Sequence, residues 1–454
     1  MIKRKIDGKI SGFLLNDRRA LLVTGARQVG KTFSIRKVGR ECFENFVEIN
    51  FIEQPDAVDL FNGHNGAKDL LMRLSIFTHK NLVPGKTLVF FDEVQECKEI
   101  VTSIKFLVDE GSYKYVMSGS LLGVELNDLR SIPVGYIDEL MMYPLDFMEF
   151  VEAIGIGDDV LDYLHNCYKN RQAVDKFIHK QMLEAIRLYL IIGGMPSAVQ
   201  NYIDTNNLRK VFEIQRGIIR TYKRDITKYD LEHKLQIEEI YDLIPSELNA
   251  KNKRFILKEL NEKARFTKYE NSFLWLKNAG VAIPAYNIEE PLLPLLLNKQ
   301  RSLFKLFIND VGLLAAMYGG NIQVRLLGKD SNVNFGAVYE NFVAQELNAH
   351  GFAVENSLYY FNSKKQGELD FVVEYNGNVL PIEVKSGKDY ERHRALANVI
   401  DNKAYGIPLA HVYCQDNLQV KGNIVYFPVY MLMFFEQNQI EDGIFKFDLK
   451  GLKV

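Results

Sequence analysis

The segment 25–32, which reads GARQVGKT, constrains the fold more than any other part of this sequence. It fits the pattern G-x-x-x-x-G-K-[ST], whose glycines allow a turn so tight that several main-chain N–H groups point at one phosphate. The apolar run 20–24 before it predicts a buried strand, and residues 33–40 after it can begin a helix. A strand, a loop of this kind and a helix in this order predict a nucleotide-binding α/β domain.

The loop residues have expected roles at a bound nucleotide. Lys31 can reach the β- and γ-phosphates, and the Thr32 hydroxyl can hold Mg²⁺. The expected cofactors are therefore ATP and Mg²⁺. The rest of the expected nucleotide site consists of Gly25, Ala26, Arg27, Gln28, Val29 and Gly30. The alternative is a loop that fits the pattern by chance and has only a structural role.

A second apolar run, residues 87–91, ends in two acids, Asp92 and Glu93. A continuous apolar run is typical of a parallel strand buried on both faces, and ligands bind at the carboxyl ends of such strands. We expect Asp92 to hold Mg²⁺, directly or through water. We expect Glu93 to be catalytic, orienting and polarising the attacking water. The alternative is a pair of surface acids that happen to follow a strand.

A third apolar segment, residues 113–117, ends at Ser118, with Ser120 two positions later. Either hydroxyl could sense the γ-phosphate, although a polar residue that simply ends a strand is an equal alternative. A further cation could stabilise the transition state. The candidates for it are three arginines, Arg130, Arg220 and Arg224. The sequence does not choose among them, and a surface arginine without this role is the default for each.

Composition and charge limit the classes of protein to which this chain can belong. Its 454 residues suggest about two to four domains. Lys and Arg total 56 against 58 for Asp and Glu, so nothing attracts the whole chain to nucleic acid, and DNA binding would need a local basic patch. The four cysteines lie far apart, which argues against a zinc ribbon or a disulfide framework and indicates a reducing, cytoplasmic location. No run approaches the roughly 18 apolar residues of a membrane span.

The order of the expected elements divides the chain into four domains. Residues 1–152 alternate strands and helices, which is typical of a parallel sheet covered on both faces. Residues 153–235 have a helical pattern and would form a lid behind the nucleotide. Residues 236–295 combine short helices with a strand, as in a winged helix, a module that binds DNA in some proteins and serves as a spacer or protein dock in others. Residues 296–454 form the C-terminal domain.

The C-terminal domain carries a second group of charged residues. Two strand-like segments joined by an Asn-Gly turn predict a hairpin. Glu383 and Lys385 face the same side of the second strand, where Asp370 of the first strand can meet them. Two carboxylates and an ammonium on one face can hold Mg²⁺ and activate water against a phosphodiester, and Glu340 from an expected helix could add a carboxylate. The alternative is an exposed, salt-bridged strand face.

These motifs together resemble those of the AAA-family ATPases of bacteria and archaea that carry a C-terminal domain of unknown function. The shared landmarks, which span nearly the whole chain, are GARQVGKT, LVFFDEVQ, SGS, YPLDFMEF, IGGMP, the Asp225-Ile226 stretch followed by Tyr229, KLFINDVGLL, YENFVAQEL, GELDFVV and PIEVKSGK. The resemblance implies a P-loop NTPase core of the AAA+ type with a helical lid and a winged helix, and it gives Ser118 the position of a polar sensor. An arginine often follows the glycine that is Gly135 here, so Tyr136 departs from the family pattern.

The C-terminal segment resembles the PD-(D/E)xK nucleases, which have the α/β fold of restriction endonucleases. Asp370, Glu383 and Lys385 match the catalytic positions of that superfamily, and Glu340 matches its usual helix acid. The resemblance implies a metal site that contains Asp370, Glu383 and Glu340.

Two hypotheses of different classes follow. In the first, ATP hydrolysis by the N-terminal domain is coupled to Mg²⁺-dependent cleavage of DNA by the C-terminal domain. In the second, ATP drives a regulatory switch or scaffold, and the nuclease-like domain is an inactive module that binds a protein partner; the near-neutral charge favours this version. A P-loop kinase for a small molecule is a third alternative, which Glu93 beside Asp92 disfavours because that pair suits activation of water. The oligomeric state stays open.

Overall fold

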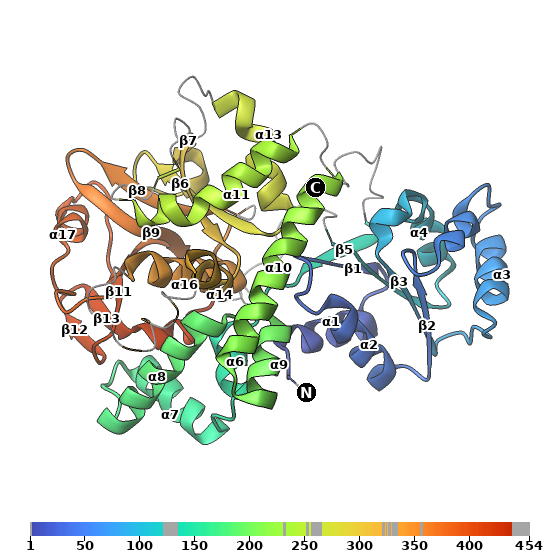
Figure 1. The fold of residues 1–454 in the computed structure, drawn as a ribbon, viewed down its shortest axis with the longest axis horizontal. Helices are drawn as coiled ribbons and strands as arrows, with labels where there is room; N and C mark the ends of the chain where they lie inside the picture. The colour runs from blue at the N-terminus through green and yellow to red at the C-terminus, as the bar shows by residue number, and fades with distance from the viewer. Residues whose placement is uncertain are drawn as a thin grey trace, which may run out of the picture.

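Two β-sheets organise the chain in the computed structural model (Figure 1). The structure describes residues 2–120, 135–229, 233–250, 254–255, 266–319, 323, 325, 328, 335–354 and 357–437. Arg130, one of the candidate cations, lies outside these residues. The first sheet belongs to the N-terminal part of the chain and the second to the C-terminal part, with helices from the middle of the sequence between and beside them.

The first sheet has five parallel strands in the order β2-β3-β4-β1-β5. Its strands are β1 (Ala20–Thr24), β2 (Asn45–Asn50), β3 (Thr87–Asp92), β4 (Lys114–Ser118) and β5 (Ile137–Met141). The helices that cover it are α1 (Lys5–Asn16), α2 (Lys31–Cys42), α3 (Ala67–Thr78) and α4 (Lys98–Glu110), with short 3-10 turns at Pro55–Phe61 and Val94–Glu96.

Successive residues of β1 pack on opposite faces of this sheet, as a strand requires. Leu21 and Val23 share a hydrophobic core with α1 and α2, whereas Ala20 and Leu22 share one with α3 and α4. Both faces are therefore buried, which explains why the strands read as continuous apolar runs in the sequence. The predicted α/β fold with a parallel sheet is confirmed.

A series of helices leads from the first sheet to the second. They are α6 (Phe147–Ala153), α7 (Asp158–Asn170), α8 (Lys176–Ile192), α9 (Pro196–Thr205), α10 (Leu208–Tyr229), α11 (Lys234–Asn249) and α13 (Phe266–Asn278). Helix α10 has 22 residues, and in Figure 1 it runs between the two sheets.

The second sheet has eight strands in the order β12-β13-β11-β10-β9-β8-β6-β7, with mixed directions. Its strands are β6 (Ala282–Ile288), β7 (Lys299–Ile308), β8 (Leu358–Ser363), β9 (Gly367–Tyr375), β10 (Asn378–Val384), β11 (Ala410–Cys414), β12 (Gln419–Lys421) and β13 (Ile424–Pro428). The helical elements beside it are α14 (Val311–Tyr318), α16 (Gly336–Ala349), α17 (Arg394–Asp401) and the 3-10 turns Leu295–Asn298 and Val429–Phe434.

Two hairpins in this sheet concern the expected hairpin and the expected domain boundary. Strands β9 and β10 form the expected antiparallel hairpin, and its two turn residues, Asn376 and Gly377, both have positive φ, as a type I′ turn requires. Strands β6 and β7 form a second hairpin, and β6 also pairs with β8, so this hairpin extends the C-terminal sheet. The expected boundary at 295/296 falls inside the β6–β7 hairpin.

The two halves share one continuous hydrophobic core. Phe147 of α6, Tyr189 of α8 and Phe342 of α16 pack edge to face, with ring centroids 5.5 to 6.1 Å apart. The main-chain N–H of Gly194 donates to buried Asp310 at 2.5 Å, which joins the IGGMP and KLFINDVGLL landmarks. Among the described residues, no helix combines the length and the apolar character that a lipid bilayer would demand.

Candidate functional site

The loop 25–30 joins the end of β1 to the start of α2, as the sequence predicts. Gly25 has φ 134°, and a β-carbon there would lie 2.2 Å from the carbonyl oxygen of Met142, so no larger residue fits without movement of the backbone. Gly30 has φ 103° and is the N-cap of α2. The loop therefore leads directly into a helix N-terminus, where N–H groups and the helix dipole favour an anion.

Lys31 is the first residue of α2, and its side chain folds back against the loop that precedes it. Its ammonium donates to the carbonyl oxygens of Gly25 and Ala26, both at 2.9 Å, and the residue is only 8% exposed. Burial lowers the pKa of Lys31 to about 8, although the nearby charges of Glu93 and Asp92 oppose the change. A buried ammonium bound mainly by neutral carbonyls would gain from an anionic ligand such as a phosphate.

Asp92, at the end of β3, is the centre of a converging set of polar groups. The Thr32 hydroxyl donates to it at 3.0 Å, the Asn50 amide donates at 3.1 Å, and the Ser118 hydroxyl donates at shorter range. Burial, with a contribution from the charge of Glu93, raises the pKa of Asp92. The hydroxyl of Thr32 and the carboxylate of Asp92 are hard oxygen ligands side by side, so these residues fit Mg²⁺.

The sequence analysis did not predict Asn50 as a member of this group. Asn50 ends β2, which neighbours β3, and the register pairs it directly with Asp92. The carboxyl ends of parallel strands meet at one edge of the sheet. The strand order of a P-loop fold is therefore the signal that could have identified it.

Glu93 follows Asp92 with φ 57°, which turns its side chain away from the strand direction. Its carboxylate accepts from the amide of Gln95 at 2.6 Å and from the hydroxyl of Ser120 at 3.4 Å. Ser120 in turn accepts from Arg27 Nε at 3.3 Å. Ser118 thus contacts the expected metal ligand, whereas Ser120 contacts the expected base.

Helix α10 contacts the loop at Arg27. The guanidinium Nη1 of Arg27 lies 2.7 Å from Asp225 Oδ1, and the Tyr222 hydroxyl donates to the Arg27 carbonyl at 3.2 Å. Tyr222 and Asp225 are buried, whereas Arg220 and Arg224 are exposed positions of the same helix. The structure therefore connects Arg27 to Glu93 through the Ser120 hydroxyl.

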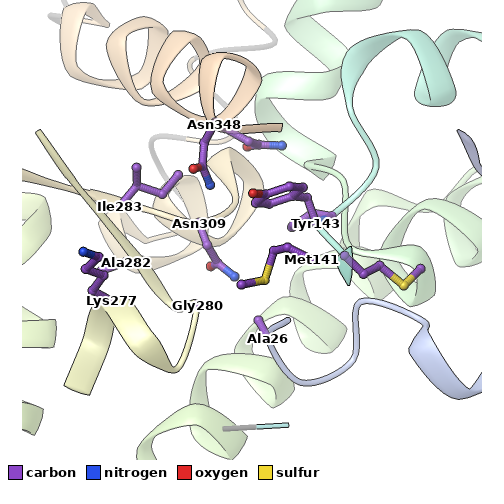
Figure 2. Close-up of a pocket in the computed structure, with 12 residues that line it drawn as sticks. Ala26, Met141, Tyr143, Lys277, Gly280, Ala282, Ile283, Asn309 and Asn348 are labelled. Carbon is purple, nitrogen blue, oxygen red and sulfur yellow. The ribbon is translucent and has the colours of Figure 1, made fainter. Parts of the chain in front are cut away.

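The back of the loop is held by Arg4, which sequence reasoning also missed. Its guanidinium donates to the carbonyls of Val29 at 2.9 Å and Tyr143 at 2.8 Å, and it pairs with Glu149 at 3.1 Å. A small pocket of about 30 Å³ lies on another side of the loop (Figure 2). Ala26 lines it together with Gly280, where a β-carbon would lie 3.2 Å from the Ala26 nitrogen. This pocket has room for water but not for a nucleotide.

The C-terminal acid cluster brings Asp370, Glu383 and Lys385 together, and the charge of Glu340 acts on Lys385 from α16. Asp370 of β9 accepts from the main-chain N–H of Val384 at 2.8 Å, and Lys385 lies 3.1 Å from Glu383. Burial and the neighbouring charge of Asp370 raise the pKa of Glu383 to about 8. Asp370, Glu383 and Lys385 therefore meet as the hairpin predicts.

The fourth residue, Glu340 of α16, faces a lysine that the sequence analysis did not identify. Lys305 of β7 has no solvent exposure, and its ammonium lies 2.7 Å from Glu368 and 3.9 Å from Glu340. The ring of Tyr360 lies 4.8 Å from the same ammonium. Burial alone would lower the pKa of Lys305, but the charges of Glu340 and Glu368 raise it above the usual range.

Lys305 therefore supplies a positive charge inside the cluster where the resemblance implies a metal ion. Within the described parts of the chain, no three acidic, His or Cys side chains are placed to share a metal ion. In this arrangement the residues do not fit the metal site that the resemblance implies, because the helix acid is neutralised by an ammonium.

Comparison with known families assigns the N-terminal part of the chain and leaves the rest open. Residues 17–151 match the model of an AAA domain. Residues 183–324 and 335–432 match two further models, each described only as a domain of unknown function. Residues 17–151 therefore form an AAA-type P-loop domain, and the nuclease-like character of the C-terminal domain stays a prediction.

Two curated relatives share a short stretch with this chain. They are the uncharacterized proteins Mb2031c of Mycobacterium bovis and Rv2008c of Mycobacterium tuberculosis, each 34% identical over 87 residues. The match spans 19% of this chain and 19% of each relative, so the chain covers about a fifth of their length.

Solved structures match this chain at low identity and with TM-scores below 0.5. The Walker-type ATPase PABY2304 of Pyrococcus abyssi is 15% identical with a TM-score of 0.44, and the alignment covers 70% of this chain and 96% of that one. The Orc1 protein of Aeropyrum pernix in complex with DNA is 12% identical with a TM-score of 0.28, over 72% of this chain and 94% of that one. Similarity at this level carries no information about activity.

Proposed function

We propose that this protein binds ATP with Mg²⁺ at the loop 25–32 and hydrolyses the γ-phosphate. The observation that carries the proposal is the convergence of three groups at the carboxyl edge of the first sheet. These groups are the ammonium of Lys31, the Thr32–Asp92 oxygen pair and the carboxylate of Glu93. Phosphoryl transfer needs little covalent chemistry from the protein, so positioning and charge are the contributions expected of such a site.

Each group has a role in the proposed reaction. The main-chain N–H groups of the loop bind the phosphates, and Lys31 exchanges the carbonyls of Gly25 and Ala26 for phosphate oxygens. Thr32 and Asp92 hold Mg²⁺, which when bound neutralises charge on the β- and γ-phosphates. Glu93 orients a water for attack on the γ-phosphorus, and Gln95 and Ser120 fix the direction of its carboxylate.

Glu93→Gln and Lys31→Ala test this assignment in the purified protein. The Gln variant keeps the shape of the side chain but not the charge, so we expect ATP to bind normally and to turn over at least about 100-fold more slowly. Lys31→Ala should lose both binding and turnover. Wild-type turnover by either variant would contradict the assignment.

We further propose that the nucleotide state controls how the AAA domain contacts the rest of the chain. In this scheme residues 153–235 act as the lid, and residues 236–295 and 296–454 act as the modules that respond. Support comes from two contacts on the loop itself: α10 binds Arg27 through Asp225 and Tyr222, and Gly280 lies against Ala26. A phosphate that moves the loop must move these contacts too.

Of the two hypotheses for the C-terminal domain, the regulatory one has the better support. An ammonium that already neutralises Glu340 and Glu368 favours an inactive module that binds a protein partner. The contact of Asp370, Glu383 and Lys385 is the observation that keeps a DNA nuclease as the second candidate.

A nicking assay on supercoiled DNA with Mg²⁺ or Mn²⁺ separates the two hypotheses. Nicking by the wild type that Asp370→Ala abolishes, with ATP turnover unchanged, would establish the nuclease. We expect no nicking under any of these conditions. If the protein binds DNA without cutting it, a steep loss of binding with salt would indicate phosphate contacts.

A further inference from the structure

We propose that Arg27 supplies a second cation at the γ-phosphate from within the same chain, and that Asp225 of α10 holds Arg27 in place. This inference rests on the proposed ATP hydrolysis. It identifies a residue pair 198 positions apart in the sequence, and it makes an arginine from a neighbouring molecule unnecessary for turnover.

Arg27 lies close to the residues that we expect around the γ-phosphate. Arg27 Nε lies 3.3 Å from Ser120, and Ser120 lies 3.4 Å from the carboxylate of Glu93, the proposed base. The charge of Arg27 also reaches Lys31: burial is the main cause of the lowered pKa of Lys31, and Arg27 adds to it. A cation that lies near both the loop lysine and the base lies near the phosphate that they act on.

The chemistry of Arg27 suits this place. Negative charge spreads over the γ-phosphate oxygens in the transition state, and an arginine aimed at them accelerates known reactions of this class by about 10³- to 10⁵-fold. The guanidinium has five N–H donors in a fixed plane. Arg27 can therefore keep its contacts with Asp225 and Ser120 and still donate to a phosphate oxygen.

The other arginines at or near the loop are less suited to this role. Arg4 directs its guanidinium to the carbonyls of Val29 and Tyr143 and to Glu149, behind the loop. Arg220 and Arg224 are exposed positions of α10, whereas Tyr222 and Asp225 of that helix contact Arg27.

Because Asp225 lies on α10, the position of this helix determines where Arg27 is held. The ion pair is asymmetric, because Asp225 is buried whereas a quarter of the Arg27 side chain is exposed. Asp225 acts through Arg27 and does not contact the phosphate, so it is a positioning residue. A shift of α10 would withdraw the cation, and turnover would then depend on the state of the lid.

The test measures ATP affinity and turnover separately in Arg27→Ala, Arg27→Lys and Asp225→Asn. We expect kcat to fall about 100-fold or more in Arg27→Ala, with ATP affinity within about threefold of the wild type. Arg27→Lys should restore part of kcat, and Asp225→Asn should lower kcat about tenfold. The matched control is Lys223→Ala on the same helix, whose side chain pairs with Asp242 of α11 at 2.6 Å and which should turn over normally.

Mixing two inactive variants distinguishes a cation in the same chain from one in a neighbour. Lys31→Ala lacks ATP binding but retains Arg27, whereas Arg27→Ala binds ATP but lacks the cation. No recovery of turnover in the mixture supports the proposal, and recovery would overturn it. Wild-type turnover by Arg27→Ala would also overturn it and would leave ATP hydrolysis intact, whereas an inactive wild type would defeat the proposed function itself.

Discussion

Each half of the molecule buries a lysine, and the surroundings of the two are opposite. Lys31 donates to two neutral carbonyls, and burial lowers its pKa to about 8. Lys305 lies between two carboxylates, which raise its pKa despite complete burial. Burial outweighs the nearby charges that favour the ammonium of Lys31, whereas the carboxylates around Lys305 outweigh its burial. The proposed phosphate site would bring a further negative charge to Lys31, whereas Lys305 already has two carboxylates beside it.

The carboxylates in the two halves also differ in the charge of the groups around them. Asp92 accepts hydrogen bonds from the neutral donors Thr32, Asn50 and Ser118, and its pKa is raised. Glu340 and Glu368 face an ammonium instead. The N-terminal edge can therefore accept a divalent cation, while Lys305 already supplies one positive charge in the C-terminal cluster.

The largest expected effect is the loss of ATP turnover when Lys31 is replaced. Lys31→Ala should reduce ATP hydrolysis about 10³-fold, equivalent to about 4 kcal/mol, because the ammonium that donates to the loop carbonyls is removed. Phosphate release at a fixed Mg-ATP concentration that saturates the wild type measures it. Lys37→Ala is the matched control, since Lys37 lies on the same helix but pairs with Asp7 at 2.8 Å. Equal losses in both variants would mean a general effect on α2.

The same substitution at both lysines should have unequal effects on folding. Lys305→Met removes the ammonium that faces buried Glu340 and partly exposed Glu368, so we expect the free energy of unfolding to fall by about 3 kcal/mol. Lys31→Met removes a charge that burial disfavours, so we expect almost no loss. Urea denaturation of the two variants measures the difference.

A compensating variant separates loss of charge balance from loss of packing. Adding Glu340→Gln and Glu368→Gln to Lys305→Met removes the two carboxylate charges that the ammonium faced and should restore most of the stability. If Lys305→Met alone is as stable as the wild type, then another cation neutralises the cluster, and the contrast between the two halves fails.

The sequence can place the N-terminal candidate residues at one edge of the sheet because their motifs are short and the fold orders them. Asp92 and Ser118 end strands β3 and β4, and Lys31 and Thr32 begin the helix after β1. Parallel strands bring their carboxyl ends to one edge. The β9–β10 hairpin is equally local, since an Asn-Gly turn fixes its register and places Asp370 beside the end of β10.

The contacts that the sequence does not reveal are the distant ones. Lys305 reaches the acid cluster only because β6 pairs with both β7 and β8, an order that no local pattern specifies. Arg27 meets Asp225 because α10 packs over the loop, although the two residues are separated by most of the AAA domain and the helices that follow it. Such pairings depend on tertiary packing, which composition and periodicity do not encode.

Ligand stabilisation should distinguish the two halves with a smaller effect. Mg-ADP at about 100 times its dissociation constant should raise the free energy of unfolding by about 2.7 kcal/mol, and Mg²⁺ alone should not. Thr32→Val should weaken the stabilisation by Mg-ADP, whereas Asp370→Asn should leave it unchanged. Stabilisation by Mg²⁺ alone that depends on Asp370 would reveal a metal site in the C-terminal cluster.

The smallest expected effect is a dependence of stability on pH that comes from Glu383. Its pKa is raised from 4.5 to about 8 by burial and by the charge of Asp370, while the ammonium of Lys385 opposes the change. Between these values the folded protein holds a proton that the unfolded chain has lost, so this group makes the folded state less stable as pH rises through the window. The slope is at most about 1.4 kcal/mol per pH unit.

Glu383→Gln isolates this contribution, because other buried acids titrate in the same window and remain in both proteins. Glu346, with a pKa raised to about 8, and Asp310, with a pKa raised to about 6, have the same sign. We expect the stability of the wild type to fall more steeply than that of Glu383→Gln between about pH 5 and pH 7, by about 1 kcal/mol per unit. Millimolar Mg²⁺ should leave this difference in place, because Lys305 already neutralises part of the cluster. If Mg²⁺ abolishes the difference, then Glu383 is a metal ligand. Both halves of the molecule would then bind a divalent cation.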